Sequence, residues 1–158
     1  MVKYTVIFLA LFLTLSKGFS AEKPDKKAPT IITADKVEYF NKERLIVYNG
    51  NVEVNKGNIY LRADSMKVYL DIKNDVARIV AVGNVYFKQE NKWGKGNEGE
   101  YIKDQDVIIL RGEAEVHQDK NSVEGEIIYY YITEEKAVST GQKERVRTIF
   151  FPKDKEAK

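Results

Sequence analysis

The chain has 158 residues, of which 26 are lysine or arginine, 24 are aspartate or glutamate and none is cysteine. The lack of cysteine excludes disulfide bonds and a lipid-modified N-terminal cysteine. The formal net charge of +2 becomes about zero without residues 1–20, because that segment holds Lys3 and Lys17 but no acid. A neutral chain lacks the basic footprint of a nucleic-acid-binding protein, so we expect no nucleic-acid partner.

The first 20 residues have the pattern of a secretory signal peptide. Lys3 provides a basic start, the apolar run Thr5–Leu15 follows, and Gly18 and Ser20 suit a cleavage site after Ser20. An apolar run of about a dozen residues is short for a membrane span, which needs ~20. We therefore expect a cleaved signal peptide over residues 1–20. Cleavage after Ala21 and an uncleaved N-terminal anchor are the alternatives.

Charged segments flank the central part of the chain. Residues 21–30 contain Pro24 and Pro29 and several charges, and residues 153–158 are almost entirely charged. Segments of this composition bury too little apolar surface to fold by themselves. We expect a flexible leader over residues 21–30, one domain over residues 31–152 and a charged tail over residues 153–158.

A sequence unit recurs four times between the leader and the tail, at intervals of about 30 residues. A small residue followed by an acid or an amide opens each unit, and a glycine closes it. The opening pairs are Ala34-Asp35, Ala63-Asp64, Gly96-Asn97 and Gly125-Glu126, and the closing glycines are Gly50, Gly83, Gly112 and Gly141. A fixed period of this size is typical of stacked repeat architectures.

Each unit holds two short apolar-rich runs around a polar turn, which predicts a β-hairpin. In the first unit Val37 and Tyr39 alternate with polar residues, residues 41–43 form the turn, and Leu45–Tyr48 is the returning strand. Later turns are expected at residues 71–75, 103–106 and 133–135, and a last run covers Val146–Phe151. No stretch has the period of a helix, so the sequence predicts an all-β jellyroll or a related open-ended β structure.

The glycines at positions 94, 96 and 99 match the spacing of a dinucleotide-binding fingerprint. That motif requires a helix after the glycines, whereas an apolar strand pattern follows here, and Glu98 and Glu100 would repel phosphate. We interpret the three glycines as marking the start of a strand.

The remaining polar candidates also favour structural roles. The repeated acids Asp35, Asp64 and Glu126 lack the ligand density of a calcium loop, and the only histidine, His117, is expected to face solvent. We predict no metal, no cofactor and no catalytic residue. A secreted β hydrolase is the enzymatic alternative, and it would need paired carboxylates across a groove.

Several segments resemble the OstA-like domain family, which acts in lipopolysaccharide transport. They are IITADKVEYF, GNVEV, LRADSMKVY, GNVYF, NSVEGEIIYYY and RVRTIFFP, and together they extend over roughly Thr30–Pro152. The resemblance implies a β-jellyroll of many antiparallel strands, open at both ends, in a periplasmic protein. It also implies that lipopolysaccharide acyl chains travel in an apolar groove from the inner to the outer membrane.

The partners implied by the resemblance are lipopolysaccharide, held through lipid A, and other copies of the chain in a head-to-tail bridge. An LptC-like inner-membrane protein would meet the N-terminal edge, and an LptD-like outer-membrane protein would meet the C-terminal edge. The predicted assembly-edge residues are Ile31, Ile32, Val146, Thr148 and Phe150. The alternative is an LptC-like membrane-anchored scaffold with the same domain.

Strand parity and the alignment of the repeats assign the groove lining. Tyr39, Val68, Tyr101 and Tyr130 occupy one repeat position, and a bulge is implied at each Ala-Asp pair. Each residue assigned to the groove could alternatively belong to a dry core. The predicted lipid-binding residues are Ile32, Val37, Tyr39, Val52, Val54, Leu61, Met66, Val68, Val85, Phe87, Tyr101, Ile109, Val116, Ile128 and Tyr130. The resemblance favours lipid contact at Ile32, Phe87 and Tyr101.

Overall fold

A computed structural model describes residues 28–134, 136–141 and 143–152 of the chain. The predicted signal peptide, most of the predicted leader and the predicted tail lie outside the described residues. Among the described residues, no helix is long and apolar enough to cross a membrane. The first strand begins at Thr30, at the end of the predicted leader.

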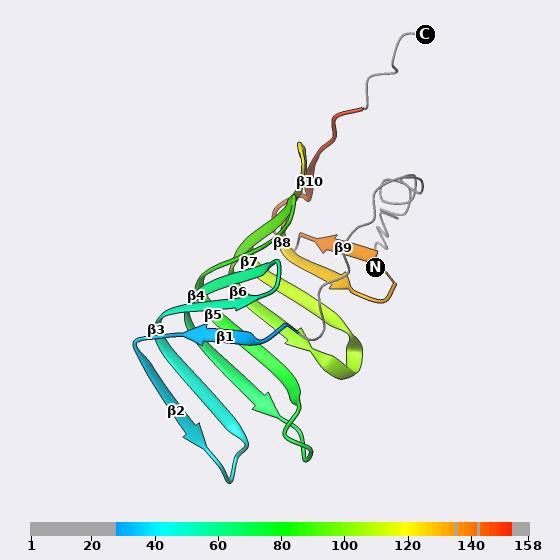
Figure 1. The fold of residues 1–158 in the computed structure, drawn as a ribbon. Coiled ribbons are helices and arrows are strands. Elements are labelled where there is room, and N and C mark those ends of the chain that lie inside the picture. Colours follow the sequence, from blue (N-terminus) through cyan, green and yellow to red (C-terminus); the bar gives the residue numbers. More distant parts are fainter. Residues whose placement is uncertain (1–27, 135, 142, 153–158) are drawn as a thin grey trace.

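Ten strands form one antiparallel sheet (Figure 1). They are β1 (Thr30–Thr33), β2 (Lys36–Phe40), β3 (Leu45–Lys56), β4 (Ile59–Leu70), β5 (Val76–Gln89), β6 (Lys92–Ile102), β7 (Val107–Gln118), β8 (Asn121–Tyr131), β9 (Lys136–Thr140) and β10 (Arg147–Ile149). Consecutive strands from β3 to β8 pair with one another, and a single 3-10 turn, Lys103–Gln105, lies between β6 and β7. The expected turns at residues 71–75 and 103–106 are present between strands.

The sheet bends along a line that crosses the middle of every long strand. Register shifts mark this line, for example between Asn49 and Val52 of β3 and between Val82 and Val85 of β5. The bend divides the sheet into two arms that face each other (Figure 1). We call the arm bounded by β2 and β9 arm A and the arm bounded by β1 and β10 arm B.

Both ends of this folded sheet are open. β1 and β2 each pair only with β3, and β9 and β10 each pair only with β8. The sheet therefore does not close on itself, and four edge strands keep one side without a partner strand in the described part of the chain. The predicted all-β jellyroll with open ends is confirmed.

Two of the repeated acids, Asp35 and Asp64, stabilise the bend. Gly50 and Asn51 both have positive φ, and the Asn51 side chain donates a hydrogen bond to Asp35 at 2.8 Å. Asn84 donates to Asp64 at the same distance one unit later. A structural role was predicted for the repeated acids, and in Asp35 and Asp64 this role is to bind the bulge of the neighbouring strand.

The bulges lie one strand away from their predicted location. The register does shift at the Ala63-Asp64 pair, but the extra residue belongs to the facing glycine-asparagine pair, Gly50-Asn51 or Gly83-Asn84. Glycine suits these positions because the left-handed backbone costs an L-residue about 1–2 kcal/mol. A Cβ atom on Gly83 would in addition overlap the Asp64 carboxylate.

We predict that Gly83→Ala lowers the free energy of unfolding by about 3 kcal/mol, because backbone strain and the overlap with Asp64 add together. Gly57→Ala is the matched control. Gly57 also has positive φ (+56°), but the nearest atom to an added Cβ is 3.7 Å away, so a loss of about 1 kcal/mol is expected. Urea titrations measure both, and equal losses would contradict the role of the acid.

Candidate lipid-binding groove

The inner face of arm A carries two apolar rows that cross eight strands. Paired residues define each row, since neighbours in register point to the same face. One row contains Tyr39, Ile46, Val68, Ile79, Tyr101, Ile108, Tyr130 and Ala137. The second contains Val37, Tyr48, Met66, Ala81, Gly99, Leu110, Ile128 and Ser139. The first row holds the four residues that the repeat alignment places at one position.

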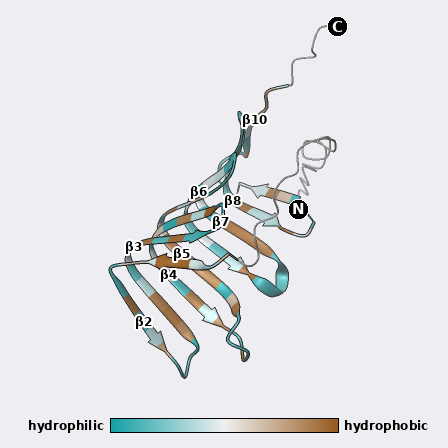
Figure 2. Ribbon diagram, in the orientation of Figure 1, coloured by the Kyte–Doolittle hydropathy of each residue, from teal (hydrophilic) through white to brown (hydrophobic). Residues whose placement is uncertain are grey.

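Arm B carries a matching row on its inner face. It contains Ile32, Val54, Leu61, Phe87, Gly94, Val116, Val123 and Thr148. Nearer the bend, Val52 pairs with Ala63 and is fully buried. Apolar residues therefore recur along the strands of both arms, whereas the turn between β6 and β7 is hydrophilic (Figure 2).

The register places every predicted groove residue on the inner face except Ile109. Ile109 pairs with Glu100 and Tyr129 on the outer face, while its neighbours Ile108 and Leu110 line the cavity. The inward assignment of Ile109 was wrong because it assumed that β7 changes parity at the bend. Two consecutive left-handed residues, Gly112 and Glu113, preserve the parity of β7. In β4, β6 and β8 the inner positions do switch parity at the bend.

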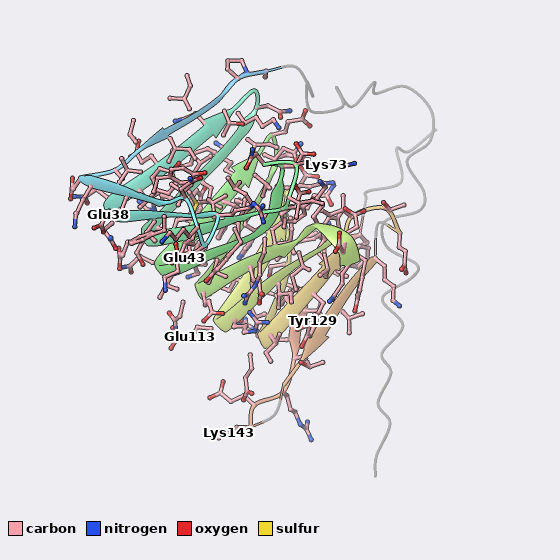
Figure 3. The ribbon with its side chains drawn as sticks, turned by 90° about the horizontal axis from the view of Figure 1, so that it is seen from below. Glu38, Glu43, Lys73, Glu113, Tyr129 and Lys143 are labelled. Atoms are coloured by element: carbon pink, nitrogen blue, oxygen red, sulfur yellow. The ribbon has the colours of Figure 1, made fainter. Side chains whose placement is uncertain are left out.

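A cavity of about 270 Å³ lies between the arms. Predicted residues that line it are Leu61, Val85, Phe87, Tyr101, Val116, Ile128 and Tyr130. Ile32, Val52, Val54, Met66 and Val68 belong to the adjoining apolar core. Val37 and Tyr39, on edge strand β2, are 60% and 54% exposed. In Figure 3 the side chains crowd between the arms, and Glu38, Glu113 and Lys143 lie at the periphery.

The three glycines of the fingerprint-like motif lie inside β6, so the prediction that they mark the start of a strand was wrong. Gly94 and Gly99 are on the inner face, where a Cβ atom on Gly94 would overlap the Phe87 ring and one on Gly99 would lie 3.0 Å from Val85. The glycines therefore leave room for large side chains from β5. They shape the groove and lack nucleotide-binding geometry, because β6 continues past them to Ile102 where the fingerprint requires the start of a helix.

Sequence reasoning missed part of the lining. The cavity is also lined by Ile59, Ile79, Ala81, Gln89, Lys92, Gly99, Glu100, Ile108, Leu110, His117, Gln118 and Ala137. The apolar members could have been found from the returning strand of each unit, whose register follows from the hairpin turn. The polar members do not belong to the apolar alternation from which the lining was predicted, so the sequence pattern does not identify them as lining residues.

A charged cluster covers part of the outer face of arm A. Glu100, 7% exposed, accepts hydrogen bonds from Arg78 at 2.6 Å and from Arg111 at 2.7 Å. Glu98 also binds Arg111, at 3.0 Å, but is far more exposed. Burial raises the pKa of Glu100, and the two guanidinium groups outweigh this effect, so the pKa lies below its ordinary value of 4.5.

Aromatic rings pack on the outer face of arm B. Trp93 and His117 stack with ring centroids 3.7 Å apart and an interplanar angle of 7°. His117 also contacts Glu115 at 3.1 Å, and Glu115 pairs with Lys95 at 3.0 Å. His117 faces outward as predicted, but its side chain is only 22% exposed because the indole ring covers it. The prediction of a solvent-exposed histidine needs this correction.

Together these features define an open-ended β-jellyroll with a groove walled by apolar side chains. Residues 31–136, more than half of the chain, match the family described as "LptA/(LptD N-terminal domain) LPS transport protein". The chain belongs to this family.

The chain is also similar to individual proteins with known names. The lipopolysaccharide export system protein LptH of Pseudomonas aeruginosa is 29% identical over 140 residues, which cover 82% of this chain and 79% of that protein. The lipopolysaccharide export system protein LptA of Haemophilus influenzae is 24% identical over 161 residues, covering 96% and 94%. The crystal structure of P. aeruginosa LptH, the LptA-homologous periplasmic component of the lipopolysaccharide transport device, has a TM-score of 0.72. It is 23% identical and covers 82% of this chain and all of that one, which supports the shared fold.

We predict that Glu100→Gln lowers the free energy of unfolding at neutral pH by about 2 kcal/mol, because the two guanidinium groups that bind this buried carboxylate lose their charged partner. A lowered folded-state pKa means that the stabilisation is complete above the unfolded-state pKa and is lost as the pH falls through the folded-state value. The difference from the parent protein should therefore shrink below about pH 4.5. Glu98→Gln is the control and should cost about 0.5 kcal/mol. A pH-independent difference in urea titrations would contradict the ionic origin.

Proposed function

We propose that this protein is a periplasmic lipopolysaccharide-binding transport protein. It carries lipopolysaccharide acyl chains in its apolar groove from the inner to the outer membrane, as part of a head-to-tail bridge. The observation that carries the proposal is the continuity of the inner apolar rows from one open edge of the sheet to the other. Membership of the lipopolysaccharide transport family supports the choice of cargo.

The physical requirement for such a carrier is an apolar path across water. Moving an acyl chain of about fourteen carbons from an apolar environment into water costs roughly 11 kcal/mol of free energy, at about 0.8 kcal/mol per CH2. Inner-facing valine, leucine, isoleucine and aromatic side chains offset this cost. Apolar walls also allow sliding, because no hydrogen bond has to break at each step. The role is binding and transfer, and no catalytic residue takes part.

The edges suggest how copies join. If the inner rows continue from one copy to the next, Thr148 of β10 lies opposite Ile32 of β1 in the following copy. Ala137 of β9 then lies opposite Tyr39 of β2. Strand directions alternate along each row, so both new pairs are antiparallel. Of the predicted edge residues, Ile31 lies within β1, and Val146 and Phe150 flank β10. They are 57%, 38% and 51% exposed.

In this arrangement the first copy meets an LptC-like inner-membrane protein through β1 and β2. The last copy meets an LptD-like outer-membrane protein through β9 and β10. The alternative function is an LptC-like membrane-anchored scaffold, which the apolar run Thr5–Leu15 keeps open. Mass spectrometry of the exported protein distinguishes the two, because loss of residues 1–20 favours the free bridge and retention of Met1 favours the anchor.

We predict that a photo-crosslinking residue at Phe87, Tyr101 or Tyr130 captures lipopolysaccharide, because all three line the cavity. Tyr129 is the matched control for Tyr130, since adjacent residues of one strand point to opposite faces and Tyr129 lies on the outer face (Figure 3). Mass detection of the lipid adduct is the measurement. Equal labelling at Tyr129 and Tyr130 would refute lipid binding in the groove.

We predict that the double variant Ile32→Cys and Thr148→Cys forms a ladder of disulfide-linked multimers under oxidation. Opposed residues of antiparallel strands bring their Cβ atoms within about 5 Å, and the chain has no other cysteine. Single variants can form dimers at most. The control pair Ile31→Cys and Thr148→Cys places the thiols on opposite faces and should give no ladder. A ladder from the control pair alone on a non-reducing gel would rule out the proposed register.

A further inference from the structure

The wall of the cavity in arm B ends in a polar row at the tips of the strands. Gln89 pairs with Lys92 and Lys92 pairs with Gln118, so the three side chains are neighbours on the inner face. All three line the cavity, next to apolar residues of the same strands. A ligand whose apolar part fills the cavity would place its other end beside an ammonium group and two amides.

The charge of this row is not balanced within the cavity. The lining residues include one carboxylate, Glu100, and it is bound by Arg78 and Arg111 on the outer face of arm A. Tyr101, Ile108 and other uncharged residues form the inner row of arm A. Among the described residues that line the cavity, Lys92 is therefore the one lysine or arginine, and it lies in arm B.

The carboxylates at the neighbouring turns are hydrogen-bonded to amide side chains. Glu90 accepts a hydrogen bond from Asn58 at 3.0 Å, and Asp119 accepts one from Asn91 at 2.8 Å. Within the described residues, no ion pair involves Lys92. Lys103, at the turn that ends arm A, contrasts with it, because its ammonium group lies 3.5 Å from Asp71 and 3.7 Å from Asp75.

Contacts on the outer face of the sheet stabilise the backbone that carries the polar row. Trp93 pairs in register with His117, directly beside the Lys92–Gln118 pair, and the two rings stack at 3.7 Å on the outer face. The Asp119 backbone N–H also donates to the Asn91 carbonyl at 3.2 Å. Since the strands are fixed here, the backbone positions that carry the inner side chains are set before a ligand binds.

We propose that Lys92, Gln89 and Gln118 form a binding site for the phosphorylated sugar headgroup of the lipid whose acyl chains occupy the groove. The ammonium group of Lys92 binds a phosphate, and the two amides bind sugar hydroxyls or phosphate oxygens. This inference rests on the proposed function. It adds a polar recognition site, located on one arm, to a groove that otherwise binds by apolar contact.

The test uses the exported protein and two probes, lipid A and the same lipid with its phosphates removed. Trp93 is the only tryptophan and adjoins Lys92, so its fluorescence follows binding. The parent protein should bind lipid A about fivefold more tightly than the dephosphorylated lipid at low salt. Lys92→Gln should abolish this preference and leave the affinity for the dephosphorylated lipid unchanged. Lys92→Arg should retain it.

Lys67→Gln is the matched control, because Lys67 is an exposed lysine on the outer face of arm A and should keep the preference. Equal effects of Lys67→Gln and Lys92→Gln would overturn the headgroup site while leaving groove binding intact. Binding of neither lipid would refute the proposed function itself. If inorganic phosphate shifts Trp93 emission as strongly as lipid A does, the site is a general anion site and the headgroup assignment fails.

Discussion

The bend across the middle of the sheet is the constraint on which the groove depends. A flat sheet of this length would have two faces in water and no interior. The pairs Gly50-Asn51 and Gly83-Asn84 take a backbone conformation that few other residues accept, and the acids of the facing strand bind them there. The apolar surface of one sheet thereby becomes the inside of two arms.

The open ends follow from the same construction. Because the sheet does not close, each inner row crosses every strand of its arm and stops at the two edge strands. Closing the sheet would join β1 and β2 to β9 and β10 of the same copy and would end every row within a single molecule. Edge strands without partners are normally a hazard for aggregation. Here they are the only places where an apolar row can pass to a second copy.

Much of this architecture could be predicted from the sequence, because the repeat fixes both the hairpins and the parity of their strands. The alignment of Tyr39 and Tyr101 at one repeat position corresponds to a shared row. Ile109 was assigned to the wrong face because the parity of β7 depends on the φ angles of Gly112 and Glu113. Two consecutive left-handed residues have no simple signature in a sequence. Lys92 was not predicted to line the cavity for another reason. From the sequence, a lysine beside a turn is expected to be solvated, and only the strand register places this one at the cavity.

The outer face of the strands carries the directional contacts that stabilise the fold, and the inner face provides the apolar surface proposed to contact the acyl chain. Directional contacts such as ion pairs and ring stacks on the inner face would obstruct an acyl chain, because each one would have to be broken or displaced as the chain moves. The structure places them outside, where Glu100 binds two arginines and Trp93 stacks on His117. The inner face can then consist of side chains that exclude water without holding any one position on the lipid. The polar row at Lys92 lies at the tips of the strands, where it can contact a headgroup and leave the apolar path unobstructed.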